Sequence, residues 1–291
     1  MTVLLSLAGV TLVVTLAAVA VARRWPRLDP VAPRVDAATH LLEHEVRARP
    51  TLRSALRSDV DPAAATGLLL TFAIGLVIVL AAAVGLLLLM VHTNSGFARY
   101  DLALARWGAD HATSTSTSTL RVISNLGGTT GVVVIGVVVG AIELRRLPSR
   151  AVPALLALVI LGQFAIQNIL KFVVDRPRPD IRRLTGFSGS SFPSGHATAA
   201  AATFAVVALV LGRRRSRPVR NVLAGLAVGM SVLVAGTRVL LGVHWFTDVL
   251  AGMAVGWAWA ALCSMAFGGR LLHFGAPVEA AEQVARRTRS G

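Results

Sequence analysis

Three ionisable side chains in the last quarter of the chain have the types and spacing of a catalytic unit. Arg238, His244 and Asp248 lie within a short stretch that is otherwise mostly apolar. His244 and Asp248 are four residues apart, and on a helix this spacing places both side chains on one face. A carboxylate in that position can fix the tautomer of an imidazole and stabilise its cation. The stretch therefore predicts a histidine that acts as a nucleophile, an acid or a base.

Two segments that precede this stretch supply groups suited to binding an anion. Lys171, the only lysine in the chain, lies seven residues before Arg178. Ser194 and Gly195 stand just ahead of a long apolar run, which is the pattern of a helix start. A helix amino terminus presents unpaired N–H groups and the positive end of the helix dipole. These groups, with His196 beside them, predict an anion-binding site.

Together the segments offer three cations, a helix amino terminus, a His–Asp pair and a second histidine. Cations and N–H donors suit a phosphate group, because phosphoryl transfer depends on positioning and on neutralising charge. Two histidines suit a nucleophile and a proton donor near neutral pH. The residues alone therefore predict phosphoryl transfer without a metal ion or other cofactor.

One pattern elsewhere in the chain points to metal chemistry instead. His40-Leu-Leu-Glu43-His44 matches the pattern of inverted zinc peptidases. It has no evident third ligand, so we interpret it as a chance match. The acidic residues near the anion-binding segments are too few and too scattered for a two-metal carboxylate cage. The single cysteine, Cys263, excludes a disulfide framework and a thiolate zinc site.

The elements that position these residues are predicted to lie in a membrane. Of the 291 residues, 55% are hydrophobic and only 15% are charged, and the mean hydropathy is +0.69. Soluble domains carry about 25% charged residues. The net charge of +15 does not follow the distribution of a nucleic-acid-binding protein. The composition therefore predicts an integral membrane protein whose surroundings are membrane lipids, with no nucleic-acid partner.

Windows without charged residues locate the spans, since a bilayer core requires about 20 apolar residues as helix. Seven spans are predicted, at 2–22, 67–91, 124–144, 151–170, 197–213, 220–240 and 246–268. The fold class is accordingly all-α, a polytopic membrane helical bundle. The third span begins with polar residues and glycines, so we expect it to start late. The first could be a signal peptide, but the lack of a basic start and the arginines that follow favour a transmembrane anchor.

The distribution of arginine orients the spans through the positive-inside rule. With the amino terminus outside, the inner segments hold 20 arginines and the outer segments nine basic residues. Six of these nine cluster in two short outer stretches: Lys171, Arg176, Arg178, Arg182, Arg183 and Arg238. The sequence predicts a multi-pass plasma-membrane protein with its carboxyl terminus inside and its site on the extracytoplasmic face.

The remaining segments complete the predicted domain organisation. Residues 1–22 form the anchor, and 23–66 form a cytoplasmic linker with a short helix on the anionic inner leaflet. The core covers 67–268, and 269–291 is a disordered cytoplasmic tail. Thr113–Thr119, which alternates Thr and Ser, is predicted to be an exposed loop.

Three motifs in this order and spacing resemble the type 2 phosphatidic acid phosphatase (PAP2) superfamily. The motifs are Lys171-x6-Arg178-Pro179, Pro193-Ser194-Gly195-His196 and Arg238-x5-His244-x3-Asp248. The resemblance covers roughly 67–268 and implies a six-helix core, to which the first span is an addition. One departure is Thr237, where the family usually has a serine before the arginine; a hydroxyl is retained.

The resemblance implies a role for each matching residue. His244 would attack phosphorus and form a phosphohistidine, Asp248 would orient it, and His196 would protonate the leaving oxygen. The phosphate oxygens would be held by Lys171, Arg178, Ser194, Gly195 and Arg238. The neighbouring charged residues would tune substrate access without being catalytic: Asp175, Arg176, Arg182 and Arg183.

The implied function is metal-independent hydrolysis of a lipid phosphate or diphosphate at the outer leaflet. Polyprenyl diphosphate, phosphatidic acid, phosphatidylglycerol phosphate and diacylglycerol pyrophosphate all fit, and the sequence does not choose among them. Three alternatives stay open: a lipid-linked phosphotransferase, a vanadate-dependent oxidase, and a non-catalytic membrane transporter or scaffold.

Overall fold

The computed structural model describes residues 1–24, 62–146, 150–213 and 215–271. Within these ranges the chain is helical apart from short connections and one long loop, residues 175–194. The elements are α1 (Thr2–Arg24), α4 (Pro62–His92), η2 (Gly96–Tyr100), α5 (Asp101–Asp110), α6 (Ser114–Asn125), α7 (Thr129–Arg146), α8 (Ala151–Val174), α9 (Gly195–Gly212), α10 (Arg217–Leu240) and α11 (Phe246–Leu271). The His40–His44 pattern and most of the predicted linker and tail lie outside the described residues.

Six of the described helices are long and apolar enough to cross a membrane, namely α1, α4, α8, α9, α10 and α11. A seventh span exists if α6 and α7, which meet at a bend of 48°, are taken together. The all-α, polytopic fold class predicted from the sequence is confirmed. The third span is the broken one, and its regular apolar part begins at Thr129, as the polar residues ahead of it indicate.

The break between α6 and α7 depends on Gly127. A Cβ atom at this position would lie 2.5 Å from Val234 Cγ1 and 2.6 Å from the carbonyl oxygen of His196. Only glycine therefore lets the turn approach α9 and α10 so closely. This turn holds the polar end of the broken span against the two helices that carry predicted site residues.

The prediction of an exposed loop at Thr113–Thr119 is wrong. Thr113 caps α6 through a capping box with Ser116, whose backbone N–H donates to the Thr113 hydroxyl over 3.1 Å. Ser116, Leu120 and Ser124 are buried and share one helical face. The low-complexity pattern concealed both the cap and this four-residue spacing, which together favour a helix.

The centre of the bundle is α9, which packs against α7, α8, α10 and α11. Its amino-terminal half is almost entirely small residues, and Ala197 and Ala199–Ala202 are buried. Small side chains let helix backbones come close, which is the usual basis of packing in membranes. The predicted anion-binding end of α9 is thereby fixed in the middle of the fold.

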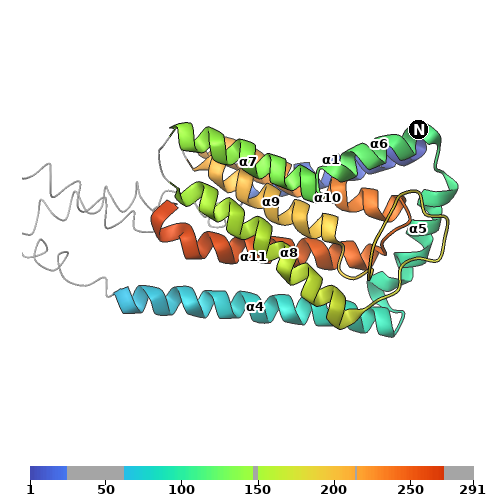
Figure 1. The fold of residues 1–291 in the computed structure, drawn as a ribbon, viewed down its shortest axis with the longest axis horizontal. Helices are drawn as coiled ribbons and strands as arrows, with labels where there is room; N and C mark the ends of the chain where they lie inside the picture. Colours follow the sequence, from blue (N-terminus) through green and yellow to red (C-terminus); the bar gives the residue numbers. More distant parts are fainter. Residues whose placement is uncertain (25–61, 147–149, 214, 272–291) are drawn as a thin grey trace, which may run out of the picture.

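The first helix, α1, packs along α10 (Figure 1). Gly225, Gly229 and Gly236 of α10 face Val19, Thr15 and Leu7 of α1, respectively. At Gly229 a Cβ atom would lie only 2.0 Å from the Thr15 hydroxyl oxygen. Helix α1 is thus seated in a glycine groove of the helix that carries Arg238.

One end of the bundle gathers the amino terminus, α5, the loop 175–194 and the α10–α11 connection (Figure 1). All three predicted motifs reach this end, because α8 and α10 end there and α9 and α11 begin there.

Candidate active site

A cavity of about 520 Å³ lies at this end of the bundle. Six of the eight site residues predicted from the sequence line it: Lys171, Arg178, Gly195, His196, Arg238 and His244. The other two, Ser194 and Asp248, are fully buried next to it. Residues that are up to 73 positions apart in the chain therefore line the same cavity.

His244 precedes α11, and Asp248 lies in the first turn of that helix. The pair was expected on one helical face; instead, the helix begins between the two residues. Asp248 Oδ2 accepts a hydrogen bond from the backbone N–H of Trp245 (2.9 Å), as a carboxylate at a helix amino terminus does. His244 Nδ1 lies 3.5 Å from the same oxygen. The carboxylate is therefore beside the imidazole, as predicted.

The hydrogen bonds assign the tautomer of His244. Arg178 Nη1 lies 3.2 Å from His244 Nε2 and can only donate, so Nε2 is the acceptor. Nδ1 then carries the proton and faces Asp248. Burial lowers the pKa of His244 to about 4, although the neighbouring Asp248 acts in the opposite direction. At neutral pH the imidazole is uncharged, and its Nε2 lone pair faces Arg178 on the cationic side of the cavity.

Arg178 and Lys171 are held by a short stretch of backbone, Ser188–Ser190. Arg178 donates to the carbonyl oxygens of Ser188 (2.7 Å), Gly189 (2.9 Å) and Ser190 (3.1 Å). The Lys171 ammonium donates to the Ser190 carbonyl as well, over 2.5 Å. Burial lowers the pKa of Arg178, which reflects the loss of hydration around its charge. The two cations are thus aimed at the cavity by neutral carbonyl groups.

Arg238 is the third cation of the cavity and is only 6% exposed. Its Nη1 donates to the Ser124 hydroxyl over 2.9 Å, and its Nε has no hydrogen-bond partner. A buried guanidinium with an unused donor is costly unless an anion completes its contacts. No carboxylate among the described residues forms an ion pair with Lys171, Arg178 or Arg238. The cavity is therefore suited to an anionic group.

The amino terminus of α9 borders the cavity at Gly195 and His196. Ser194 occupies the N-cap position, but its side chain makes no capping hydrogen bond. Its buried Oγ has no partner in the structure. A Cβ atom at Gly195 would lie 2.6 Å from Gln167 Oε1, so the Gln167 side chain would have to shift to admit a larger residue.

Comparison with known proteins decides the family. Residues 152–271 match the PAP2 superfamily, and all eight predicted site residues fall inside this range. This stretch of the chain is a PAP2-superfamily region. Across 69% of its length it superimposes on the crystal structure of a transmembrane PAP2-type phosphatidylglycerolphosphate phosphatase from Bacillus subtilis, with a TM-score of 0.59 and 26% identity. The superposition covers 98% of that chain.

Curated relatives agree with this assignment. The chain is 38% identical over 108 residues to phosphatidylglycerophosphatase B of Bacillus subtilis, covering 35% of this chain and 52% of the relative. It is 39% identical over 101 residues to a lipid A 1-phosphatase of Rhizobium etli, covering 31% and 40%. It is 36% identical over 110 residues to decaprenylphosphoryl-5-phosphoribose phosphatase of Mycobacterium tuberculosis, covering 36% and 56%. The chain thus matches about half the length of these curated relatives.

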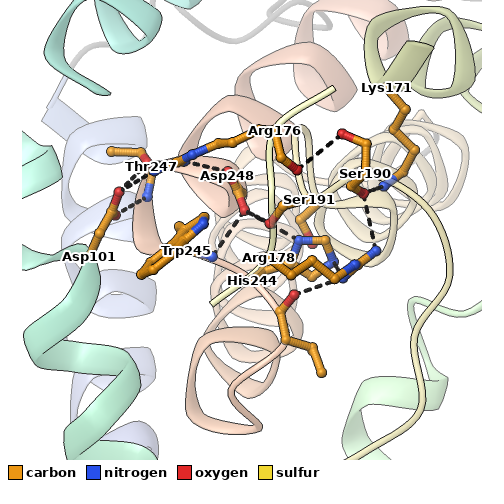
Figure 2. Close-up of polar contacts among 12 residues, drawn as sticks. Asp101, Lys171, Arg176, Arg178, Ser190, Ser191, His244, Trp245, Thr247 and Asp248 are labelled. Carbon is orange, nitrogen blue, oxygen red and sulfur yellow. Dashed lines mark hydrogen bonds and ion pairs between the residues drawn. The ribbon is translucent and has the colours of Figure 1, made fainter. Parts of the chain in front are cut away.

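Two of the residues that contact Asp248, Arg176 and Ser191, are not among the predicted site residues. Arg176 Nη1 donates to Asp248 Oδ1 over 2.6 Å, and the Ser191 hydroxyl donates to Oδ2 (Figure 2). Arg176 also pairs with Asp101 of α5. The sequence assigned Arg176 to substrate access, whereas in the structure it contacts the carboxylate behind the histidine. Its position between two motif residues was the one available signal, and nothing in the sequence linked it to Asp101.

The donor set of this PAP2 site does not resemble a metal centre. Across the described ranges, no group of three or more His, Cys, Asp or Glu residues is arranged to hold a metal ion. The charged and polar side chains that line the cavity are mainly cations, histidines and amides.

Proposed function

We propose that this protein is an integral membrane phosphatase that removes phosphate from a lipid phosphomonoester or diphosphate through a phosphohistidine on His244. The observation that carries the proposal is the environment of His244. Its Nε2 accepts from Arg178 in a cavity lined by three cations, while its Nδ1 faces Asp248. A neutral imidazole in this orientation can act as a nucleophile, because its Nε2 points to the part of the cavity where the cations would neutralise the charge of a phosphate.

In the first step, Nε2 attacks phosphorus and the bond from phosphorus to the lipid oxygen breaks. Arg178 must release Nε2 as the phosphate enters, and its guanidinium then pairs with the phosphate oxygens together with Lys171 and Arg238. Asp248 stabilises the positive charge that develops on the imidazole. His196, which lines the cavity, supplies the proton to the departing lipid oxygen.

In the second step, water attacks the phosphohistidine. His196, deprotonated by the first step, accepts a proton from the water, and the bond between Nε2 and phosphorus breaks. Inorganic phosphate leaves and the neutral His244 is restored. Ser194 and the Gly195 N–H provide neutral donors for the phosphate oxygens. No step requires a metal ion or cofactor.

The active site faces the extracytoplasmic side in this proposal, with the amino terminus outside. The distribution of arginine supports this orientation. Arg23, Arg24, Arg145, Arg146 and Arg213 lie at helix ends opposite the end that carries the site (Figure 1). At the site end, Lys171, Arg178 and Arg238 line the cavity, so the cationic charge that they add there has a chemical role in this proposal.

The substrate is expected to be a phosphate or diphosphate ester of a membrane lipid. The names of the relatives support this class, since they refer to phosphatases of phosphatidylglycerophosphate, lipid A and a decaprenyl-linked phosphoribose. Those substrates differ in the lipid and share the phosphate ester. The cavity, with its cations beside apolar and amide side chains, is compatible with such variety.

Phosphate release in detergent tests the proposal directly. Wild type and His244→Ala are compared on a panel of lipid phosphates and diphosphates, with and without EDTA. His111→Ala is the matched control, because His111 is an exposed histidine at the end of α5. We expect release that persists in EDTA, is lost in His244→Ala and is retained in His111→Ala. Release that survives in His244→Ala would overturn the mechanism, and transfer of phosphate to an added alcohol would indicate a phosphotransferase.

A further inference from the structure

A chain of charged side chains runs from α5 to the catalytic histidine without entering the cavity. Arg176 donates through Nη2 to Asp101 (2.8 Å) and through Nη1 to Asp248 (2.6 Å) (Figure 2). One guanidinium therefore bridges two carboxylates that are 147 positions apart in the sequence. None of Asp101, Arg176 and Asp248 lines the cavity, so none of them meets the substrate there.

The bridge gives the two carboxylate oxygens of Asp248 different hydrogen-bond partners. Arg176 occupies Oδ1, which leaves Oδ2 for the Ser191 hydroxyl, the Trp245 N–H and the imidazole of His244. This division fixes the rotation of the carboxylate group. If Arg176 were absent, Oδ1 would lose its donor, and the carboxylate could turn away from His244 Nδ1 to find another.

Asp101 holds the other side of the bridge and the start of α11 together. Its Oδ1 accepts from the backbone N–H of Thr247 (2.8 Å), and its Oδ2 accepts from the Thr247 hydroxyl (2.7 Å). Thr247 directly precedes Asp248. Asp101 therefore anchors the backbone of the helical turn that carries Asp248, in addition to the guanidinium that contacts its side chain.

We propose that Asp101 and Arg176 are a positioning pair, which sets the carboxylate of Asp248 and, through it, the imidazole of His244. The inference rests on the proposed phosphatase function. It assigns α5, which lies outside the region matched to the PAP2 family, a part in catalysis. Buried ion pairs add little net stability because desolvation offsets their attraction. The expected effect of this bridge is therefore a more precisely held Asp248 carboxylate rather than a more stable fold.

Four variants and two matched controls test the pair: Arg176→Gln, Arg176→Lys, Asp101→Asn and the double variant Asp101→Asn/Arg176→Gln, with Arg106→Gln and Asp110→Asn as controls. The control residues are an exposed arginine and an exposed aspartate of α5, the helix that carries Asp101, so they remove charges of the same two signs outside the bridge. Steady-state kcat and KM are measured on the best lipid substrate of the wild type. Size-exclusion profiles and thermal unfolding in detergent confirm that each variant is folded.

Arg176→Gln and Asp101→Asn are expected to lower kcat by about 10- to 100-fold, the range typical of groups that orient a ligating or catalytic residue from behind. KM should change by less than about twofold, because neither residue lines the cavity. The double variant should be no worse than Arg176→Gln alone, since both changes break one network. Arg176→Lys should recover part of kcat by keeping a cation against Asp248. The two controls should match wild type.

Three results would overturn the pair. They are an unchanged kcat in Arg176→Gln, a raised KM with unchanged kcat, and losses that multiply in the double variant. If Arg176→Gln does not fold, Asp101→Asn and Arg176→Lys decide the question in the same assay. The outcome is separable from the proposed function, because His244→Ala is assayed alongside. Activity in His244→Ala refutes the phosphohistidine, whereas an inactive His244→Ala with a fully active Arg176→Gln refutes the positioning pair alone.

Discussion

Arg238 donates a hydrogen bond to the hydroxyl of Ser124 over 2.9 Å, although 114 residues separate them. Ser124 belongs to α6, the first half of the broken span, and Arg238 lies on α10. The contact fixes one side of the guanidinium and leaves Nε without a partner. The broken span thereby helps to aim a cation that is proposed to bind phosphate.

Ser124→Ala should weaken the hold on phosphate. A hydrogen bond to a charged group is worth about 1.5–3 kcal/mol, so we expect kcat/KM to fall by about 10-fold or more. The measurement is steady-state hydrolysis of the best lipid substrate. Ser118→Ala, which removes an exposed hydroxyl from the same helix, is the control and should behave as wild type. Equal kinetics in the two variants would show that Ser124 does not orient Arg238.

Asp248→Asn should abolish most of the chemistry while preserving the fold. An amide can present N–H toward Nδ1 and so favour the tautomer in which Nε2 is protonated and cannot attack. Replacement of the orienting aspartate in a serine-protease triad lowers kcat by about 10⁴-fold, and we expect an effect of similar order here. Rapid-quench analysis should find no phosphohistidine. Asp180→Asn, an exposed aspartate in the loop after α8, should retain full activity.

The pH profile should report the depressed pKa of His244. The neutral imidazole is the active form, so activity falls as the pH drops through the pKa, which burial lowers to about 4 rather than the usual 6.5. We expect the enzyme's acid limb in kcat/KM near pH 4. The profile is measured with two substrates whose phosphate groups have different pKa values. A limb caused by ionisation of the substrate shifts from one substrate to the other, whereas a limb caused by the enzyme stays at the same pH. An enzyme limb near pH 6.5 would contradict the burial of His244.

Gly127→Ala should destabilise the protein and impair the site. The added methyl group meets Val234 and the carbonyl of His196 at distances that real Cβ atoms do not reach. Overpacking of this kind costs about 1–3 kcal/mol, so the midpoint of thermal unfolding in detergent should fall. Gly85→Ala is the matched control, because nothing lies within 4 Å of a Cβ atom there. A Gly127→Ala variant as stable as this control would indicate that the turn can relax.

The sequence predicted the parts of this fold that depend on local pattern. The positions of the spans follow from the requirement that lipid imposes on the backbone, so long apolar windows were sufficient. The motif residues around His244 were found because their order and spacing resemble those of the PAP2 superfamily, which residues 152–271 match. The capping box of Thr113 was present in the sequence as well, but a repetitive Thr–Ser pattern hid it.

Contacts between distant segments could not be predicted in the same way. Asp101 has no local feature that marks it, because its role depends on Arg176 lying beside it after folding. Ser191 and Ser124 are likewise ordinary serines until the loop and the broken span bring them to charged partners. A single sequence records residue types and spacing, whereas these contacts are decided by tertiary structure.

The seating of α1 in the glycine groove of α10 has a consequence for the order in which the molecule is assembled. Arg23 and Arg217, at the neighbouring ends of these helices, are 194 residues apart. During synthesis α1 therefore enters the bilayer before α10, its main packing partner, and stays without it while α4 to α9 are inserted. Its docking coincides with the arrival of the helix that carries Arg238.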